Sequence, residues 1–95
     1  MQFSFMVGVN EKHRVDFSFD QFLGHLDILV DGQPAVKDFR MFSVSLTKRY
    51  EFTVGNEERH NVVIEKQRKL FLAGLRPQKY RIFIDGELVQ THEGS

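Results

Sequence analysis

Apolar and polar residues alternate through most of this chain. Phe3, Phe5, Val7 and Val9 occupy every second position, and the same period of two returns in later short segments. Those later apolar residues stand at 15, 17 and 19; 26, 28 and 30; 42, 44 and 46; 50, 52 and 54; 62 and 64; 70 and 72; and 80, 82 and 84. Short alternating segments that recur every ~8–12 residues between turn residues are typical of a β-sandwich or a small barrel. The pattern therefore predicts an all-β fold, an antiparallel β-sandwich of about eight short strands joined by hairpins, with little or no helix.

Two of these hairpins carry a specific turn signal. Asp31-Gly32 and Asp85-Gly86 each follow an alternating segment and precede another apolar stretch. A two-residue type I′ turn needs positive φ at both central residues, which Asp-Gly adopts at low cost. The segments that lead into the two turns also resemble each other. We interpret them as two similar hairpins within one domain rather than as an ancestral repeat.

Helical spacing occurs only in residues 19–26. Phe19, Phe22, Leu23 and Leu26 follow an i, i+3, i+4, i+7 pattern, but Gly24 interrupts it. A segment this short does not form a stable helix by itself. We expect a loop with at most one turn here, and a frayed end at residues 93–95.

Length and composition limit the remaining possibilities. The 95 residues predict a single domain over 1–95, with 13 basic and 13 acidic residues and no Cys. The absence of Cys excludes disulfides and thiolate chemistry. No apolar run approaches the ~20 residues of a membrane-spanning helix. The first residues do not resemble a secretion signal, so we expect a cytoplasmic location.

The residues that commonly perform catalysis or bind metals lack the necessary spacing. The four His residues, at 13, 25, 60 and 92, include no pair at i+2 or i+4. We interpret them as surface His beside charged neighbours. There is no Gly-x-Ser-x-Gly motif and no Gly-rich phosphate loop. The sequence thus predicts a protein that is not an enzyme, with no cofactor, metal or small-molecule ligand.

Two groups of residues are candidates for binding a partner. Ten Phe and no Trp indicate Phe packing between two sheets, but Phe22, Leu23 and Phe39 do not fit a single inward face. If exposed together, they would mark a protein contact or a site of self-association. Residues 59–81 carry seven basic residues against one acidic residue, Glu65. The basic residues are Arg59, Lys66, Arg68, Lys69, Arg76, Lys79 and Arg81. They suggest the alternative, an anion- or nucleic-acid-binding domain, unless they simply project into solvent from separate strands.

Several motifs, in order and at similar spacing, resemble the Fas apoptotic inhibitory molecule family. They are His13-Arg14-Val15-Asp16-Phe17, Gly24, Ile28-Leu29-Val30-Asp31-Gly32, Lys37, Met41-Phe42, Phe52-Thr53-Val54-Gly55, Val62-Val63-Ile64 and Tyr80-Arg81-Ile82-Phe83-Ile84-Asp85-Gly86. The family carries Trp just before its Met-Phe pair, where this chain has Arg40, and it has two such domains in tandem. The resemblance implies a β-sandwich without catalytic residues. It also implies protein interaction in apoptosis inhibition or in countering aggregation.

A second resemblance concerns Tyr80. Leu75-Arg76-Pro77-Gln78-Lys79-Tyr80 is similar to the tyrosine corner of transthyretin-like and immunoglobulin-like sandwiches. In such a corner the Tyr hydroxyl bonds back to the backbone, which implies a structural role for Tyr80.

Overall fold

The computed structural model describes residues 1–20, 22–68 and 78–94, and these residues form two antiparallel sheets. The first sheet has the order β1-β2-β3-β4 and the second the order β5-β6-β7-β8-β9. The strands are β1 (Gln2–Val7), β2 (His13–Asp20), β3 (His25–Val30), β4 (Gln33–Pro34), β5 (Arg40–Val44), β6 (Thr47–Val54), β7 (His60–Arg68), β8 (Gln78–Ile84) and β9 (Glu87–Gly94). The predicted all-β fold is confirmed, with nine strands among the described residues. Each sheet is built from consecutive strands of the chain, the first from β1 to β4 and the second from β5 to β9.

Both Asp-Gly hairpins form as predicted. Asp31 and Gly32 connect β3 to β4 with φ of 51° and 81°, and Asp85 and Gly86 connect β8 to β9 with φ of 51° and 85°. Positive φ at both positions is the condition for a type I′ turn, in which the turn twist matches the twist of its strands.

Two details differ from the sequence-based expectation. In residues 19–26 the strands continue further than expected, because Phe19 belongs to β2 and Leu26 pairs with it from β3. Only the short connection between these strands is a turn. At the other end of the chain, β9 pairs with β8 as far as Gly94, so the structure assigns residues 93 and 94 to a strand rather than to a frayed end.

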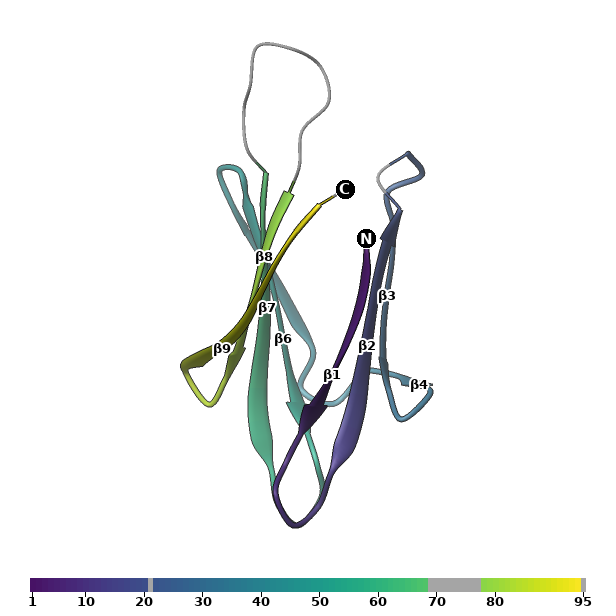
Figure 1. Ribbon diagram of the computed structural model, residues 1–95, viewed down its shortest axis with the longest axis vertical. Coiled ribbons are helices and arrows are strands. Elements are labelled where there is room, and N and C mark those ends of the chain that lie inside the picture. Colours follow the sequence, from purple (N-terminus) through teal and green to yellow (C-terminus); the bar gives the residue numbers. More distant parts are fainter. Residues whose placement is uncertain (21, 69–77, 95) are drawn as a thin grey trace.

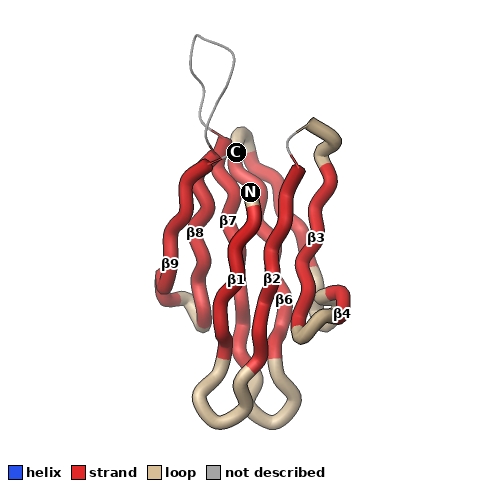
Figure 2. The backbone as a smooth tube through the Cα atoms, turned by 45° about the vertical axis from the view of Figure 1, so that its right-hand side comes forward, coloured by secondary structure: helices blue, strands red, loops and turns tan. Residues whose placement is uncertain are grey.

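The two sheets approach each other at one end and diverge at the other (Figure 1). The β1–β2 and β6–β7 turns lie side by side where the sheets meet, and we call this the closed end (Figures 1 and 2). The β2–β3 and β5–β6 turns lie at the opposite, open end. The alternation of the sequence explains the layers, since every second residue of each long strand points between the sheets.

The core contains aromatic side chains from both sheets. The Phe3 and Phe17 rings stack with centroids 4.7 Å apart, and Tyr80 from the opposite sheet packs edge-on against Phe17 at 5.3 Å. Other buried apolar residues surround them: Phe5, Val7, Val15, Ile28, Tyr50, Phe52, Val54, Val62, Ile64 and Ile82. Stacked and edge-on ring pairs contribute beyond the area that they bury. Phe thus does supply much of the packing between sheets.

Candidate functional site

At the closed end, each turn places a carboxylate against the backbone of the other. Glu58 accepts hydrogen bonds from the backbone N–H groups of Val9, Asn10 and Glu11, at 2.6, 2.7 and 3.1 Å. Three successive N–H donors around one carboxylate form a strong, charge-assisted arrangement. This contact joins the β6–β7 turn of one sheet to the β1–β2 turn of the other.

The same contact is made in the opposite direction. Glu11 accepts hydrogen bonds from the backbone N–H groups of Asn56, Glu57 and Glu58, at 2.7, 2.8 and 3.2 Å. Each turn begins with a glycine at strongly positive φ, 107° at Gly8 and 104° at Gly55. A Cβ at either glycine would lie 1.9 Å from a backbone oxygen of its own turn, so only glycine permits this close geometry.

A histidine supports each of the two carboxylates. His13 contacts Asp31 through Nδ1 and Glu11 through Nε2, both at 2.5 Å. His60 contacts Asp85 through Nδ1 and Glu58 through Nε2, both at 2.6 Å. The aspartates are those of the two Asp-Gly turns. We call these six residues, Glu11, His13, Asp31, Glu58, His60 and Asp85, the turn clasp.

The clasp shifts the pKa values of its members in opposite directions. Hydrogen bonds to Asp31 and then Glu11 raise the pKa of His13, and hydrogen bonds to Asp85 and then Glu58 raise that of His60. The histidines, followed by the backbone N–H donors, lower the pKa values of Glu11 and Glu58 to about 2. The two flanking carboxylates therefore favour the protonated form of each imidazole.

This arrangement suits structure rather than catalysis. Both ring nitrogens of His13 and of His60 already bind carboxylates, so neither ring has a free nitrogen to accept a proton from a substrate. The interpretation of these two residues as ordinary surface His was wrong, because each ring is enclosed between two turns and is largely covered. Within residues 1–20, 22–68 and 78–94, no group of His, Asp and Glu could hold a metal ion.

A repeated sequence pattern could have revealed the clasp. Val7-Gly8 is followed by Glu11 and His13, and Val54-Gly55 is followed at the same spacing by Glu58 and His60. Both halves then reach an Asp-Gly turn. In this correspondence β1 to β4 match β6 to β9, and β5 has no counterpart. The similarity between the two halves is thus wider than the two hairpins identified from the sequence.

The three candidate partner residues do not form one surface. Phe22 and Leu23, 97% and 81% exposed, lie in the β2–β3 turn at the open end of the first sheet. Phe39 precedes β5 in the other sheet, and its partly exposed ring stacks on Phe52 at 6.3 Å. Phe39 instead belongs to a different exposed segment.

That segment is the outer edge of the five-stranded sheet. β5 pairs only with β6, and all five of its residues are exposed. We call residues 39–46 the β5 edge. Its exposed apolar side chains are Phe39, Met41, Phe42, Val44 and Leu46. Arg40 is the only charged residue in this segment, although natural edge strands are usually protected by charge, by proline or by a covering segment.

The basic candidates are dispersed over the molecule. Arg59 lies in the closed-end turn, whereas Lys79 and Arg81 lie on the outer face of β8, where Arg81 binds Glu65 through Nε at 2.9 Å. Lys69 and Arg76 fall outside the described residues. Lys66 and Arg68 point between the sheets at the open end, beside Lys48. The described basic residues therefore do not share one face.

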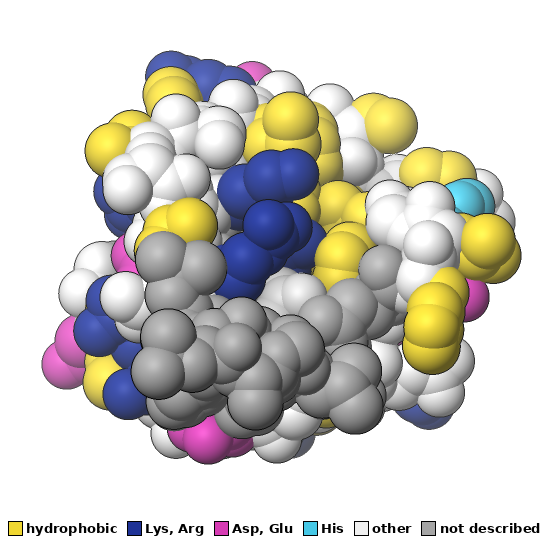
Figure 3. All heavy atoms as spheres, turned by 90° about the horizontal axis from the view of Figure 1, so that it is seen from above, with side chains coloured by type: hydrophobic (Ala, Val, Ile, Leu, Met, Phe, Trp, Pro, Cys, Tyr) yellow, Lys and Arg dark blue, Asp and Glu magenta, His cyan; other side chains and the backbone are white. Residues whose placement is uncertain are grey.

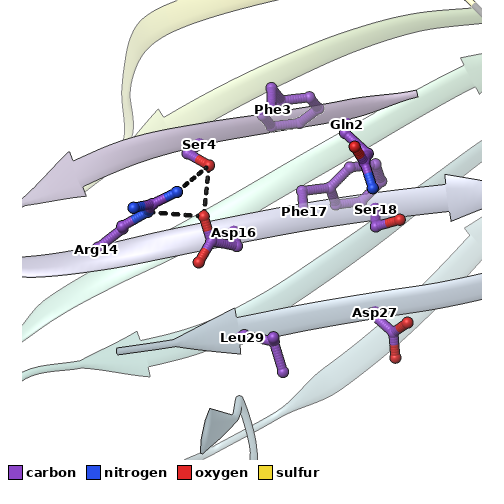
Figure 4. A pocket seen from close by; sticks show the side chains of 9 residues that line it. All are labelled: Gln2, Phe3, Ser4, Arg14, Asp16, Phe17, Ser18, Asp27 and Leu29. Carbon is purple, nitrogen blue, oxygen red and sulfur yellow. Dashed lines mark hydrogen bonds and ion pairs between the residues drawn. The ribbon is translucent and has the colours of Figure 1, made fainter. Parts of the chain in front are cut away.

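A groove lies on the outer face of the first sheet. It has a volume of about 470 Å³ and runs across β1, β2 and β3. Arg14 Nε donates to Asp16 at 2.9 Å, and Ser4 donates to the same carboxylate, so these polar groups already satisfy one another (Figure 4). These three residues of the groove are therefore bonded mainly to one another.

Comparison with known protein families, with characterised proteins and with solved structures finds no match. The described part of the chain contains no helix long and apolar enough to cross a membrane. Functional inference therefore depends on the chain's own residues.

Proposed function

We propose that this protein is a non-enzymatic β-sandwich interaction module whose β5 edge binds an extended segment of a protein partner, in the simplest case a second copy of this chain. The observation that supports this is the position of β5 at the edge of its sheet, where no described strand pairs with its outer side and where Met41, Phe42 and Val44 are all exposed. An added strand would satisfy the free backbone groups of this edge, and pockets for alternate side chains would give selectivity.

The two faces of β5 offer different contacts. Met41 pairs with the buried Tyr50 and so shares the inner face, whereas Phe42 pairs with Arg49 on the outer face. A partner strand could thus bury apolar side chains on both sides of the sheet. An edge of this kind would also serve the anti-aggregation role that the resemblance to the Fas apoptotic inhibitory molecule family implies.

Substitution of exposed apolar residues of the β5 edge by lysine tests this function. We expect light scattering of the wild type to show concentration-dependent dimers, because two apolar edges can pair around a twofold axis. Phe42→Lys and Val44→Lys should shift the protein to monomers. Met6→Lys is the matched control, since Met6 is equally exposed but lies on the opposite sheet.

A monomeric wild type would exclude self-association and leave a different partner. Selection of binders from a displayed library of extended peptides then provides the test. The selected peptides should bind the wild type and should not bind Val44→Lys. A protein that is monomeric at all concentrations and selects no peptide from the library would contradict the proposal. If Phe22→Asp weakens binding more than Val44→Lys does, the partner binds at the β2–β3 turn and not at the β5 edge.

A further inference from the structure

A cluster of cations lies inside the open end of the sandwich. Lys48 and Lys66 are direct register partners on β6 and β7, and Arg68 follows two residues later on the same face. The backbone N–H of Arg68 donates to Leu46 O at 2.9 Å, which holds the β5–β6 turn beside them. Together with Ser45 and Leu46, these three side chains line a hollow of about 120 Å³.

Lys66 is the most deeply placed of the three. Its side chain is only 5% exposed and reaches across to the first sheet, where Nζ lies 3.5 Å from the centre of the Phe19 ring. Viewed from the open end, Lys and Arg side chains gather near the middle of this face, beside hydrophobic side chains (Figure 3). The cluster thus runs from the buried Lys66 between the sheets to the exposed Arg68 at the rim of the open end.

These charges lack a compensating anion in the described structure. No carboxylate of the described residues forms an ion pair with Lys48, Lys66 or Arg68, whereas the outer-face Arg81 binds Glu65. Like charges directly opposite each other across two strands are destabilising, and a buried charge without a partner costs still more. Burial, followed by the charges of Lys48 and Arg68, lowers the pKa of Lys66 to about 8.

A second unsatisfied group lies next to the cluster. Gln78 is the register partner of Arg68 on β8 and is 2% exposed, yet its Oε1 has no hydrogen-bond partner within the described part of the chain. A buried polar atom without a partner is uncommon in native proteins and indicates a missing water, ion or ligand. This oxygen is an acceptor and needs a donor such as a water, so it does not itself indicate an anion. The argument for an anion depends on the three cations, which have no carboxylate partner among the described residues.

We propose that the hollow formed by Ser45, Lys48, Lys66 and Arg68 binds a phosphate group, either free phosphate or the monoester of a small molecule. The planar guanidinium of Arg68 can donate hydrogen bonds to two phosphate oxygens. The ammonium groups of Lys48 and Lys66, on the same sheet, add positive charge. The hollow is too small for a larger ligand to enter completely, so an ester would extend past Leu46 toward solvent. Cation–π contact with Phe19 keeps Lys66 in place when the hollow contains no anion.

Calorimetric titration with inorganic phosphate and with phenyl phosphate tests the site. We expect one ion per chain and an affinity at least tenfold weaker in Lys66→Met. Lys79→Met is the matched control, because Lys79 lies on the outer face of the same sheet, and its affinity should stay within about twofold of wild type. Tighter binding of phenyl phosphate would identify the monoester as the ligand, and tighter binding of phosphate the free ion.

Arg68→Gln keeps the test valid if Lys66→Met does not fold, since the exposed Arg68 side chain has little role in the core. This variant should also weaken phosphate binding at least tenfold. Amide shifts on titration of wild type should centre on residues 45–48 and 66–68. No binding at millimolar phosphate, or an equal loss in Lys79→Met, would overturn the proposal.

Discussion

Glu11 and Glu58 make reciprocal contacts, since each carboxylate accepts hydrogen bonds from three backbone N–H groups of the turn that carries the other. The two turns belong to different sheets, so these hydrogen bonds join the sheets at their closed end. His13 and His60 hold the carboxylates in place and are held in turn by Asp31 and Asp85. The four carboxylates and two histidines of the clasp thus have structural roles, and the two proposed binding surfaces lie elsewhere.

Removal of either clasp carboxylate should destabilise the fold. Glu58→Ala leaves three backbone N–H groups without their acceptor and His60 without one of its two partners, so we expect the Tm to fall by several degrees. Glu57→Ala, in the same turn and with the same change of charge, should have little effect because its side chain is exposed. Thermal unfolding measured by circular dichroism makes the comparison, and equal Tm values for the two variants would contradict the clasp.

Gly8 and Gly55 should tolerate no side chain. Alanine at either position brings both a disfavoured φ and a clash with a backbone oxygen, so each variant should lose at least about 2 kcal/mol of unfolding free energy. Gly24 also has positive φ but has open space around its Cα. Gly24→Ala should therefore lose only about 1 kcal/mol. Urea denaturation measures all three, and similar losses at Gly8 and Gly24 would show that the clash is relieved at little cost.

The contribution of the clasp to stability should be greatest between pH 4.5 and 6.5. The pKa values of His13 and His60 are raised from 6.5, so their contribution is complete below pH 6.5 and is lost as the pH rises through the folded-state values. The pKa values of Glu11 and Glu58 are lowered from 4.5 to about 2, so their contribution is complete above pH 4.5 and is lost as the pH falls toward 2.

Denaturation at a series of pH values measures this profile. In the double variant His13→Gln/His60→Gln the fall in stability above pH 6.5 should disappear. His25→Gln, which changes an exposed side chain outside the clasp, should keep the fall. The comparison is made below pH 8, because the lowered pKa of Lys66 adds stability above it. An equal fall between pH 6.5 and 8 in the wild type and in the double variant would contradict the assigned role of the two histidines.

The hydroxyl of Tyr80 should contribute nothing to stability. It is buried and has no hydrogen-bond partner among the described residues, and burial raises its pKa to about 12. The backbone bond expected from a tyrosine corner is therefore not seen, although residues 75–77 of that motif lie outside the described part. Tyr80→Phe should leave the unfolding free energy unchanged or raise it by up to about 1 kcal/mol. A loss of more than that would indicate a bonded hydroxyl.

Local patterns predicted the strands and turns, but the contacts between sheets required the structure. Alternation identifies Phe3, Phe17 and Tyr80 as core residues because the period of a strand is visible in the sequence itself. The pairing of Glu11 with the 56–58 backbone joins residues 45 to 47 positions apart. The repeated spacing of Gly, Glu and His marks the two turns in the sequence, but only the fold shows that they meet. The position of Lys66 could not be predicted from the sequence either. Its charge favours the outer face of the sheet, whereas its register places the side chain on the inner face.

Hydrogen exchange at β5 tests the proposed function most directly. If the β5 edge takes up a strand, those backbone amides of Arg40–Val44 that point away from β6 should become more protected as the concentration of the chain, or of a selected peptide, rises. The amides of the β2–β3 turn should not change, and Val44→Lys should abolish the added protection. Protection that appears at Phe22 and Leu23 instead, or no change at β5 while complexes demonstrably form, would contradict binding at this edge.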